Sequence, residues 1–415
     1  MMAFKSCKID AITARRSHRI IVCLLILHLQ AGAACTKGDA NVDECKKQNL
    51  ISGEDPLVKQ QDNVSDNASF DMELYGSIRI RYRHVVHDTS EFEDSGSRIG
   101  LNSWYEFAPS SRVFARYELG FNLLQELGFD DVPYHHDQEF NSTLFTRLGY
   151  VGVQFDKDIV TFGKNWSTYY QVAGFTDHFD SFGGEASGAY NVMTDGGSSG
   201  TGRADSVLQV RLNYDLKNFL DRFEKLEINM QLQPPRPIPG MQDFDYNYGF
   251  GISTILTTSN YFSLGVAFNF SSVDTEEIPA QKRIGLNGNM SALLLGMRWY
   301  NDVWYLALTL SKSSNLQASD NLEYFDGKGM ELYARYRFYP KFYWVGGINY
   351  LRPDSGQKQA GGYLLNYYIV GVRYSIKNLS RILYIESRID NGRTYNNDYR
   401  RGHQITAGVR WDFDF

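Results

Sequence analysis

The sequence lacks any apolar run long enough to cross a membrane as a helix. Its longest apolar stretch, residues 20–29 (IIVCLLILHL), is ten residues long, whereas a bilayer-spanning helix needs about 20. No later segment reaches that length. A membrane protein with this sequence would have to cross the bilayer with strands, because only helices and closed barrels satisfy every backbone polar group in lipid.

Residues 1–34 have the composition of a signal peptide. Arg15, Arg16 and Arg19 precede the apolar stretch, and the small residues AGAA (31–34) follow it. Cleavage there would remove five Lys/Arg and one Asp, which changes the net charge of the chain from −6 to −10. An acidic chain without a clustered basic segment argues against a nucleic-acid partner.

Cysteine and proline are both scarce. Of four Cys, two lie in the predicted signal peptide, which leaves Cys35 and Cys45. In an exported chain this pair is a candidate disulfide. Alternatively, Cys35 could be a lipidated first residue, although Gly32 occupies the position where lipidation requires an aliphatic side chain. Ten Pro against 37 Gly suit many short strands joined by tight turns.

Aromatic residues are abundant although the chain is polar on average. Tyr and Phe number 28 and 26, while the mean hydropathy is −0.38. A soluble protein that buries its aromatic residues in a large dry core would not explain why the chain is both this aromatic and this polar. An outer-membrane β-barrel does, because it has an apolar outer band, aromatic girdles at both interfaces and a polar lumen.

Period-2 alternation begins near residue 71, after a polar segment (35–70) that we interpret as a periplasmic extension. In the first strand, Arg79 and Arg81 share one face and Ile78 and Ile80 share the other. Residues 71–415 are therefore expected to form a transmembrane antiparallel β-barrel of about 16 strands. The predicted strands are 72–83, 97–107, 112–122, 145–154, 158–166, 203–214, 226–233, 244–255, 261–270, 291–300, 303–312, 329–338, 342–351, 363–374, 381–389 and 403–415.

The connections between these strands alternate in length, which predicts short periplasmic turns and long extracellular loops. Short joints occur at 108–111, 156–157, 257–260, 301–302, 339–341 and 375–380. Loops rich in Asp, Asn, Ser and Gly lie at 84–96, 123–143, 271–283, 313–328, 352–362 and 390–402. The joint at 215–225 is longer than this pattern expects.

Six motifs, in order, resemble those of the general (non-specific) porins of the Gram-negative outer membrane. They are LYG (74–76), SRIGL (97–101), RLGYVGVQ (147–154), TFGKNWSTYY (161–170), GFTDHFDSFGGE (174–185) and TGRAD (201–205). Each motif alone is weakly specific, but their order and spacing are collectively strong. The resemblance covers residues 71–415 and implies a water-filled channel for passive diffusion of ions and small hydrophilic solutes.

The resemblance also implies a constriction formed by an inward-folded third loop. Asp177 matches the first acid of that loop in the family. The later glutamate of the family falls on Ser181, where the adjacent Asp180 could supply the charge. The expected acidic residues are Asp177, Asp180 and Glu185, and the expected basic residues are Arg79, Arg81, Arg98, Lys164 and Arg203. Of the basic set, Arg79 and Arg81 rest on alternation alone.

Further expectations concern assembly and partners. The final strand is amphipathic and ends the chain with Trp411, Phe413 and Phe415 on its apolar face. In barrels of this kind such a strand is recognised by the outer-membrane barrel assembly machinery. The resemblance implies a homotrimer in the cell outer membrane, in contact with lipid and lipopolysaccharide, and no cofactor or metal.

Four other interpretations of the sequence must also be weighed. A substrate-specific channel for phosphate or a sugar would have similar architecture, with an arginine ladder or lumen aromatics. A barrel enzyme would need a pre-organised catalytic set, and the histidines of the mature chain offer no convincing partners, so no enzymatic activity is expected. His135 and His136 beside Asp130, Asp131 and Asp137 resemble a metal cluster but are better explained as a solvated loop. An adhesive role of the long loops is compatible with a pore.

Overall fold

The structure is a computed structural model that describes residues 69–415, except positions 87, 89, 130–143, 218–220, 276, 277, 280–283, 378, 400 and 401. The predicted signal peptide, nearly all of the polar extension, Cys35, Cys45 and the pair His135 and His136 lie outside the described residues. Within the described part, no helix has the length and apolar character needed to span a bilayer.

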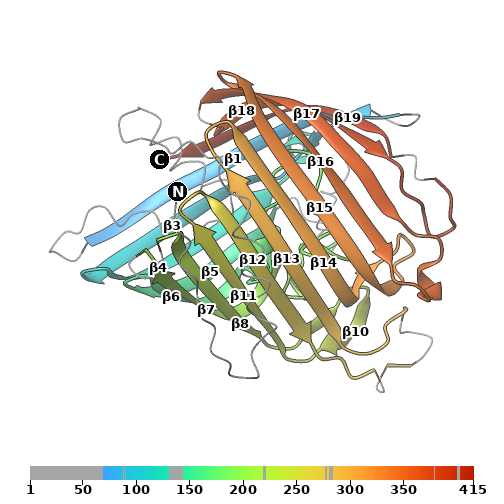
Figure 1. Cartoon of the computed structure of the whole chain (residues 1–415), viewed down its shortest axis with the longest axis horizontal. Coiled ribbons are helices and arrows are strands. Elements are labelled where there is room, and N and C mark those ends of the chain that lie inside the picture. Colours follow the sequence, from blue (N-terminus) through green and yellow to red (C-terminus); the bar gives the residue numbers. More distant parts are fainter. Residues whose placement is uncertain are drawn as a thin grey trace, which may run out of the picture. The chain divides into compact units, whose positions relative to one another are not determined.

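Sixteen antiparallel strands pair in a ring, as the alternation predicts. Figure 1 shows the tilted strands following one another around the wall, with β19 beside β1. The strands of the ring are β1 (Ser69–Val85), β3 (Ser97–Ala108), β4 (Ser111–Phe121), β5 (Leu144–Phe155), β6 (Asp158–Trp166), β7 (Arg203–Asp215), β8 (Phe223–Gln233), β11 (Gly249–Thr258), β12 (Phe262–Ser271), β13 (Met290–Tyr300), β14 (Trp304–Ala318), β15 (Tyr324–Tyr339), β16 (Phe342–Pro353), β17 (Leu365–Lys377), β18 (Arg381–Asp390) and β19 (Gln404–Asp414).

Strand β1 closes the ring, because its two edges pair with strands from opposite ends of the chain. Its first nine residues pair with β3, and its residues from Tyr75 onward pair with β19. At the carboxy-terminus, the backbone N–H of Phe415 donates to the carbonyl of Leu74 at 2.8 Å. Closure leaves no open sheet edge, which is what a strand-built membrane protein requires.

The remaining elements are short. Strand β2 (Ser90–Asp94) pairs with residues 80–84 of β1 and adds to the wall there. A separate hairpin consists of β9 (Arg236–Ile238) and β10 (Met241–Tyr246). The described residues also form three short helices: α3 (Leu123–Glu126), α4 (Tyr170–Ala173) and η4 (Lys358–Ala360).

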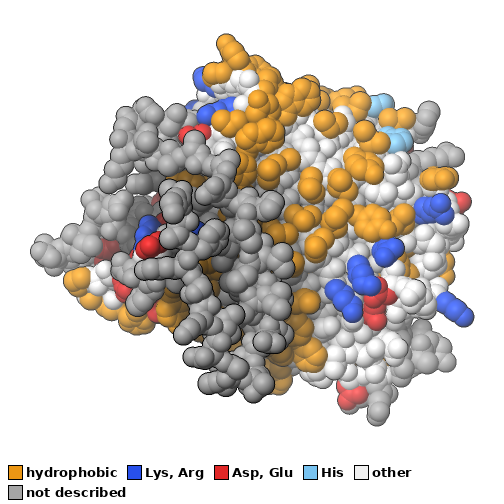
Figure 2. Space-filling model, viewed as in Figure 1, with side chains coloured by type: hydrophobic (Ala, Val, Ile, Leu, Met, Phe, Trp, Pro, Cys, Tyr) orange, Lys and Arg blue, Asp and Glu red, His pale blue; other side chains and the backbone are white. Residues whose placement is uncertain are grey.

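The wall is apolar outside and polar inside. Outward-facing side chains such as Leu101, Val113 and Ile385 are exposed, whereas inward-facing side chains such as Asn269 and Thr309 are buried. Figure 2 shows hydrophobic side chains spread over the outer face of the barrel. This arrangement inverts that of a soluble protein and suits a wall between lipid and water.

The strand ends differ from expectation by five residues or more at three places. The segment predicted as 244–255 begins only at Gly249, because residues before it belong to β10 and pair with β9. Alternation continues through both segments, so the sequence does not reveal this change of partner. Strands β14 and β15 extend beyond the predicted 312 and 329 to pair with each other, through an irregularity between Ser313 and Gln317.

Candidate functional site: the constriction loop

The connection between β6 and β7 folds into the barrel, as the resemblance predicts. We call residues 167–202 the constriction loop. Val172 of helix α4 and Phe175, which follows the helix, pack against the inner faces of β12 and β13. Both side chains are nearly fully buried. Gly265 and Gly296 make room there, because a Cβ atom at Gly296 would lie 2.5 Å from Cγ1 of Val172. An apolar contact therefore seats one end of the loop on the wall.

Two buried carboxylates hold the middle of the loop. Glu331 on β15 accepts hydrogen bonds from the backbone N–H groups of Ala186 and Ser187, at 2.8 and 2.7 Å, and from the hydroxyl of Thr176 at 2.7 Å. Glu386 on β18 accepts from the backbone N–H groups of Asp180 and Ser181, at 3.1 and 2.9 Å. These contacts satisfy loop backbone donors that would otherwise be buried without a partner.

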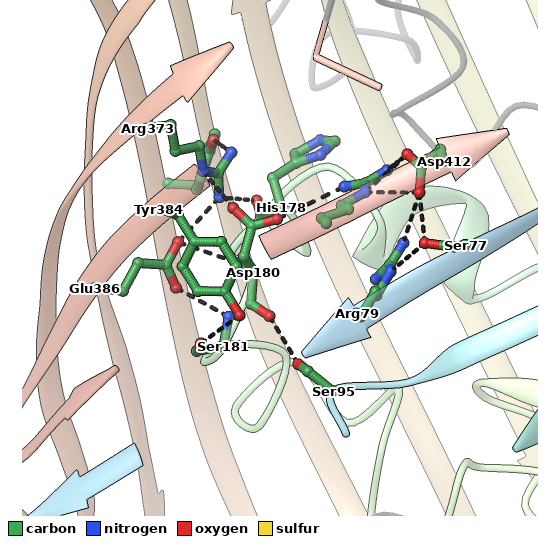
Figure 3. A network of polar contacts seen from close by, with 12 residues as sticks. Ser77, Arg79, Ser95, His178, Asp180, Ser181, Arg373, Tyr384, Glu386 and Asp412 are labelled. Carbon is green, nitrogen blue, oxygen red and sulfur yellow. Dashed lines mark hydrogen bonds and ion pairs between the residues drawn. The ribbon is translucent and has the colours of Figure 1, made fainter. Parts of the chain in front are cut away.

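Asp180 forms ion pairs with arginines of the wall (Figure 3). Its Oδ2 lies 2.5 Å from Nε of Arg373 on β17, and its Oδ1 lies 3.7 Å from Nη1 of Arg410 on β19. Only 3% of the Asp180 side chain is exposed. Its negative charge is thus balanced at the wall.

The other two expected acids also have partners. Oδ2 of Asp177 accepts hydrogen bonds from the hydroxyls of Tyr170 and Tyr190, at 2.6 and 2.9 Å, within the loop itself. Glu185 pairs with Arg388 on β18 at 3.1 Å and keeps about a third of its side chain exposed. The structure therefore brings Asp180 and Glu185 to wall arginines that were not among the expected bases. Within the described residues, none of the three expected acids forms an ion pair with an expected base.

Two of the expected bases, Arg79 and Arg98, lie together on the inner face of neighbouring strands. Arg79 on β1 is directly opposite Arg410 on β19, and Arg98 on β3 is opposite Ser77, two residues from Arg79. Arg79 donates to the hydroxyl of Ser77 at 2.9 Å and lies 3.9 Å from Asp412. Arg98 forms no hydrogen bond or ion pair with any residue that the structure describes.

Arg81 has a different environment from its neighbours on β1. Its Nε lies 2.8 Å from Oε2 of Glu93, and its Nη1 donates to the backbone carbonyl of Ser181 at 3.1 Å. Arg81 therefore ties the constriction loop to β1, which neighbours β19 in the wall.

Lys164 and Arg203 belong to a separate cluster at the base of the loop. Nζ of Lys164 lies 3.0 Å from Asp195 and 2.8 Å from Asp205, and Arg203 lies 3.7 Å from Asp195. Burial would raise the pKa of Asp195, but Arg203 and Lys164 hold it below its usual value. These bases fasten the loop through Asp195 and form no ion pair with Asp177, Asp180 or Glu185.

The sequence interpretation missed several charged residues of the lumen. Glu118 on β4 is shared by Arg147 on β5, at 2.9 Å, by Arg116 at 3.3 Å and by the hydroxyl of Tyr75 at 2.9 Å. Alternation placed such residues on the lumen face, but it could not give the height of each residue in the barrel. The missed residues are Arg116, Glu118, Arg147, Glu331, Arg373, Glu386, Arg388, Arg410 and Asp412.

The carboxy-terminal aromatic residues lie on the outside of the barrel. Trp411 is well exposed and is covered on one side by the guanidinium of Arg381, 4.3 Å from its ring centroid. Phe413 lies over Gly76 of β1, and its ring is 5.6 Å from that of Phe415.

Among the described residues, no group of His, Cys, Asp and Glu could hold a metal ion.

Comparison with known proteins supports the same family. Outer membrane protein S2 of Salmonella typhi is 28% identical over 218 residues, 47% of this chain and 54% of that protein. The outer membrane porin OmpD of Citrobacter koseri is 23% identical over 83% of this chain and 91% of its own. No model of a known protein family matches the chain.

Solved structures share the fold. OmpF of Salmonella typhi has a TM-score of 0.67 at 16% identity and covers 85% of this chain and 99% of its own. OmpT of Vibrio cholerae, solved in a trimer form, has a TM-score of 0.55 at 14% identity and covers 84% of this chain and 100% of its own. The chain is thus similar in sequence to outer-membrane porins of Gram-negative bacteria, and it shares their β-barrel fold.

Proposed function

We propose that this chain forms a water-filled channel in the outer membrane for passive diffusion of ions and small hydrophilic solutes. One observation supports it above all: a closed 16-strand barrel contains an inward-folded loop that is fixed to its wall. Such a loop narrows a lumen without any chemical step. Passage then depends on solute size and charge.

The charges of the lumen favour anions. The acids of the constriction loop are paired with wall arginines or held by tyrosines, whereas Arg98 forms no direct ion pair with a described carboxylate. Around it, Glu118 is shared by two arginines, and Asp412 is shared by Arg410 and Arg79. A surplus of fixed positive charge attracts anions into a narrow pore and repels cations.

We propose a homotrimer, in keeping with the trimer form of OmpT from Vibrio cholerae. The exposed apolar outer faces would contact lipid, lipopolysaccharide and neighbouring copies. The final strand β19, with Trp411 and Phe415 outward, would engage the barrel assembly machinery. Closed cyclic symmetry would bury the same face of each barrel.

Planar-bilayer conductance of the purified mature protein tests the channel. We expect large steps in groups of three and, under a KCl gradient, a reversal potential with the sign of chloride preference. A correctly folded barrel that does not conduct would refute the channel. A reversal potential of the opposite sign would refute the anion preference while leaving the channel in place.

A further inference from the structure

Arginines and tyrosines alternate around the inner wall from β13 to β19. Their order across neighbouring strands follows the register, in which Tyr305 is opposite Arg335, Tyr343 is opposite Arg373, and Arg373 is opposite Tyr384. We call this set the Arg/Tyr belt. It comprises Arg298, Tyr305, Arg335, Tyr343, Arg373, Tyr384 and Arg410.

Within the belt, Arg335 differs from the other arginines in its partners. Arg373 is balanced by Asp180 and Glu386, and Arg410 by Asp412. Arg335 forms no hydrogen bond or ion pair with any described residue, although only 6% of it is exposed. A buried charge without a counter-charge is costly.

Two tyrosine rings flank the guanidinium of Arg335. Its carbon Cζ lies 5.7 Å from the ring centroid of Tyr305 and 5.6 Å from that of Tyr343. These contacts hold the planar group between aromatic faces. They do not satisfy its N–H donors, which stay available to an oxygen acceptor.

The hydroxyl of Tyr343 is a second free donor beside Arg335, because it forms no hydrogen bond with the described residues. The hydroxyl of Tyr305 is already engaged, since it donates to the carbonyl of Phe175 at 2.9 Å and contacts Nε2 of His178 at 2.8 Å. Arg335 and Tyr343, on adjacent strands, thus both keep donors without an acceptor among the described residues.

The surroundings of Arg335 are rich in arginine. Burial, together with the positive charges of Arg335 and Arg373, holds the pKa of His178 well below its ordinary value, so this ring is neutral. The carboxylates packed nearby, Asp180 and Glu386, both pair with Arg373. An anion at Arg335 would meet a positive field.

The geometry points to a binding subsite for a small oxyanion, formed by the guanidinium of Arg335 and the hydroxyl of Tyr343. The inference rests on the proposed channel function, because it places the subsite on the solute path. Arg335 lies four residues before the end of β15 at Tyr339, close to the short turn into β16. The subsite is therefore on the periplasmic side of the barrel.

The chemistry selects carboxylate or phosphate oxygens. A guanidinium presents its donors in a planar fork that matches two oxygens of one anion, and a hydroxyl can donate to a third. Few contacts and partial solvation keep such binding weak, as a transport path requires. A solute that has passed the constriction loop would exchange water for these donors before it leaves.

Inorganic phosphate is the probe for a first test. In planar bilayers, phosphate added on the periplasmic side should reduce the KCl conductance of the wild type in a saturable way. Arg335→Gln should raise the half-blocking concentration about tenfold, and Tyr343→Phe should raise it by a smaller factor. Arg335→Lys should fall between, because it keeps the charge but loses the fork.

Arg337 provides the matched control. It lies two residues further along the same face of β15, nearer the rim, and is more exposed. Arg337→Gln removes the same charge and should change the half-blocking concentration less than twofold. Equal effects of both substitutions would refute the subsite and leave only a general electrostatic effect, as would an unchanged block in Arg335→Gln.

A second measurement separates the subsite from the channel. Phosphate binding to the folded protein in detergent, followed by phosphorus NMR line broadening, requires no conduction. Saturable binding that is lost in Arg335→Gln but kept in Arg337→Gln supports the subsite even if the barrel does not conduct. Conduction without saturable binding refutes the subsite and leaves the channel function intact. Heat-modifiable migration on gels confirms that each variant is folded.

Discussion

Asp180 of the constriction loop and Arg373 of β17 form an ion pair in which Oδ2 and Nε are 2.5 Å apart. The pair links the tip of an inward loop to a strand far along the chain. Arg373 also contacts Glu386 at 3.1 Å. Arg373 therefore balances both Asp180 and Glu386. The electric field in the constriction depends on whether these two acids stay paired with Arg373 or face the water of the pore.

Removing the charge of Asp180 should strengthen the anion preference. In Asp180→Asn, Arg373 and Arg410 lose a counter-charge, and the permeability ratio of chloride to potassium should rise about twofold, because a unit charge ~10 Å away across water changes an ion's energy by ~0.4 kcal/mol. Reversal potentials in a KCl gradient measure this ratio. Asp177→Asn is the matched control. It removes a negative charge from the same loop, but Asp177 is held by a tyrosine hydroxyl rather than paired with an arginine. Comparing the two variants shows whether the effect depends on the arginine pairs. A shift of Asp180→Asn toward potassium would contradict the prediction.

Removing the unpaired charge of Arg98 should have the opposite effect. Arg98→Gln takes away a positive charge that forms no direct ion pair with a described carboxylate, so the chloride preference should fall by about twofold on the same scale of interaction. Lys157→Gln is the control, because Lys157 is exposed in the turn after β5 and lies 4.0 Å from Asp215. If both substitutions shift the reversal potential equally, the lumen position of Arg98 is irrelevant.

The sequence determined most of the fold, because alternation and connection length are local properties. All sixteen predicted strands form, and the predicted loop folds inward. Pairing across the lumen could not be predicted, since it depends on which lumen-facing residues share a height after the strands tilt. The bond from Asp180 to Arg373 spans 193 positions, and no local pattern indicates it. The same limitation explains why Glu331 and Arg410 were missed.

The apolar seat of the constriction loop can be tested through Gly296. Gly296→Val places atoms where Val172 lies, since even a Cβ would be 2.5 Å from Cγ1 of Val172. The loop should move from the wall, and overpacking should cost about 1–3 kcal/mol. We expect altered step size and greater open-channel noise. Gly346→Val is the control, because a Cβ there meets nothing nearer than 3.4 Å. Unaltered conductance in Gly296→Val would show that α4 does not set the pore width.

The base of the constriction loop should resist acid. The pKa of Asp195 in the folded protein lies below its usual value, because Arg203 and Lys164 outweigh the opposing effect of burial. The stabilisation that ionised Asp195 gives to loop attachment is therefore fully present above the ordinary carboxyl pKa of about 3.9. It is lost only as the pH falls through the lower pKa that Asp195 has in the folded protein. Open-channel noise should stay constant from pH 7 to about pH 4.5, a value still above that ordinary pKa. Asp195→Asn should be noisy already at pH 7, whereas Asp215→Asn, in an exposed pair at the rim, should match the wild type. Noise that rises near pH 6 in the wild type would contradict an anchor at Asp195 and indicate a group that titrates at higher pH.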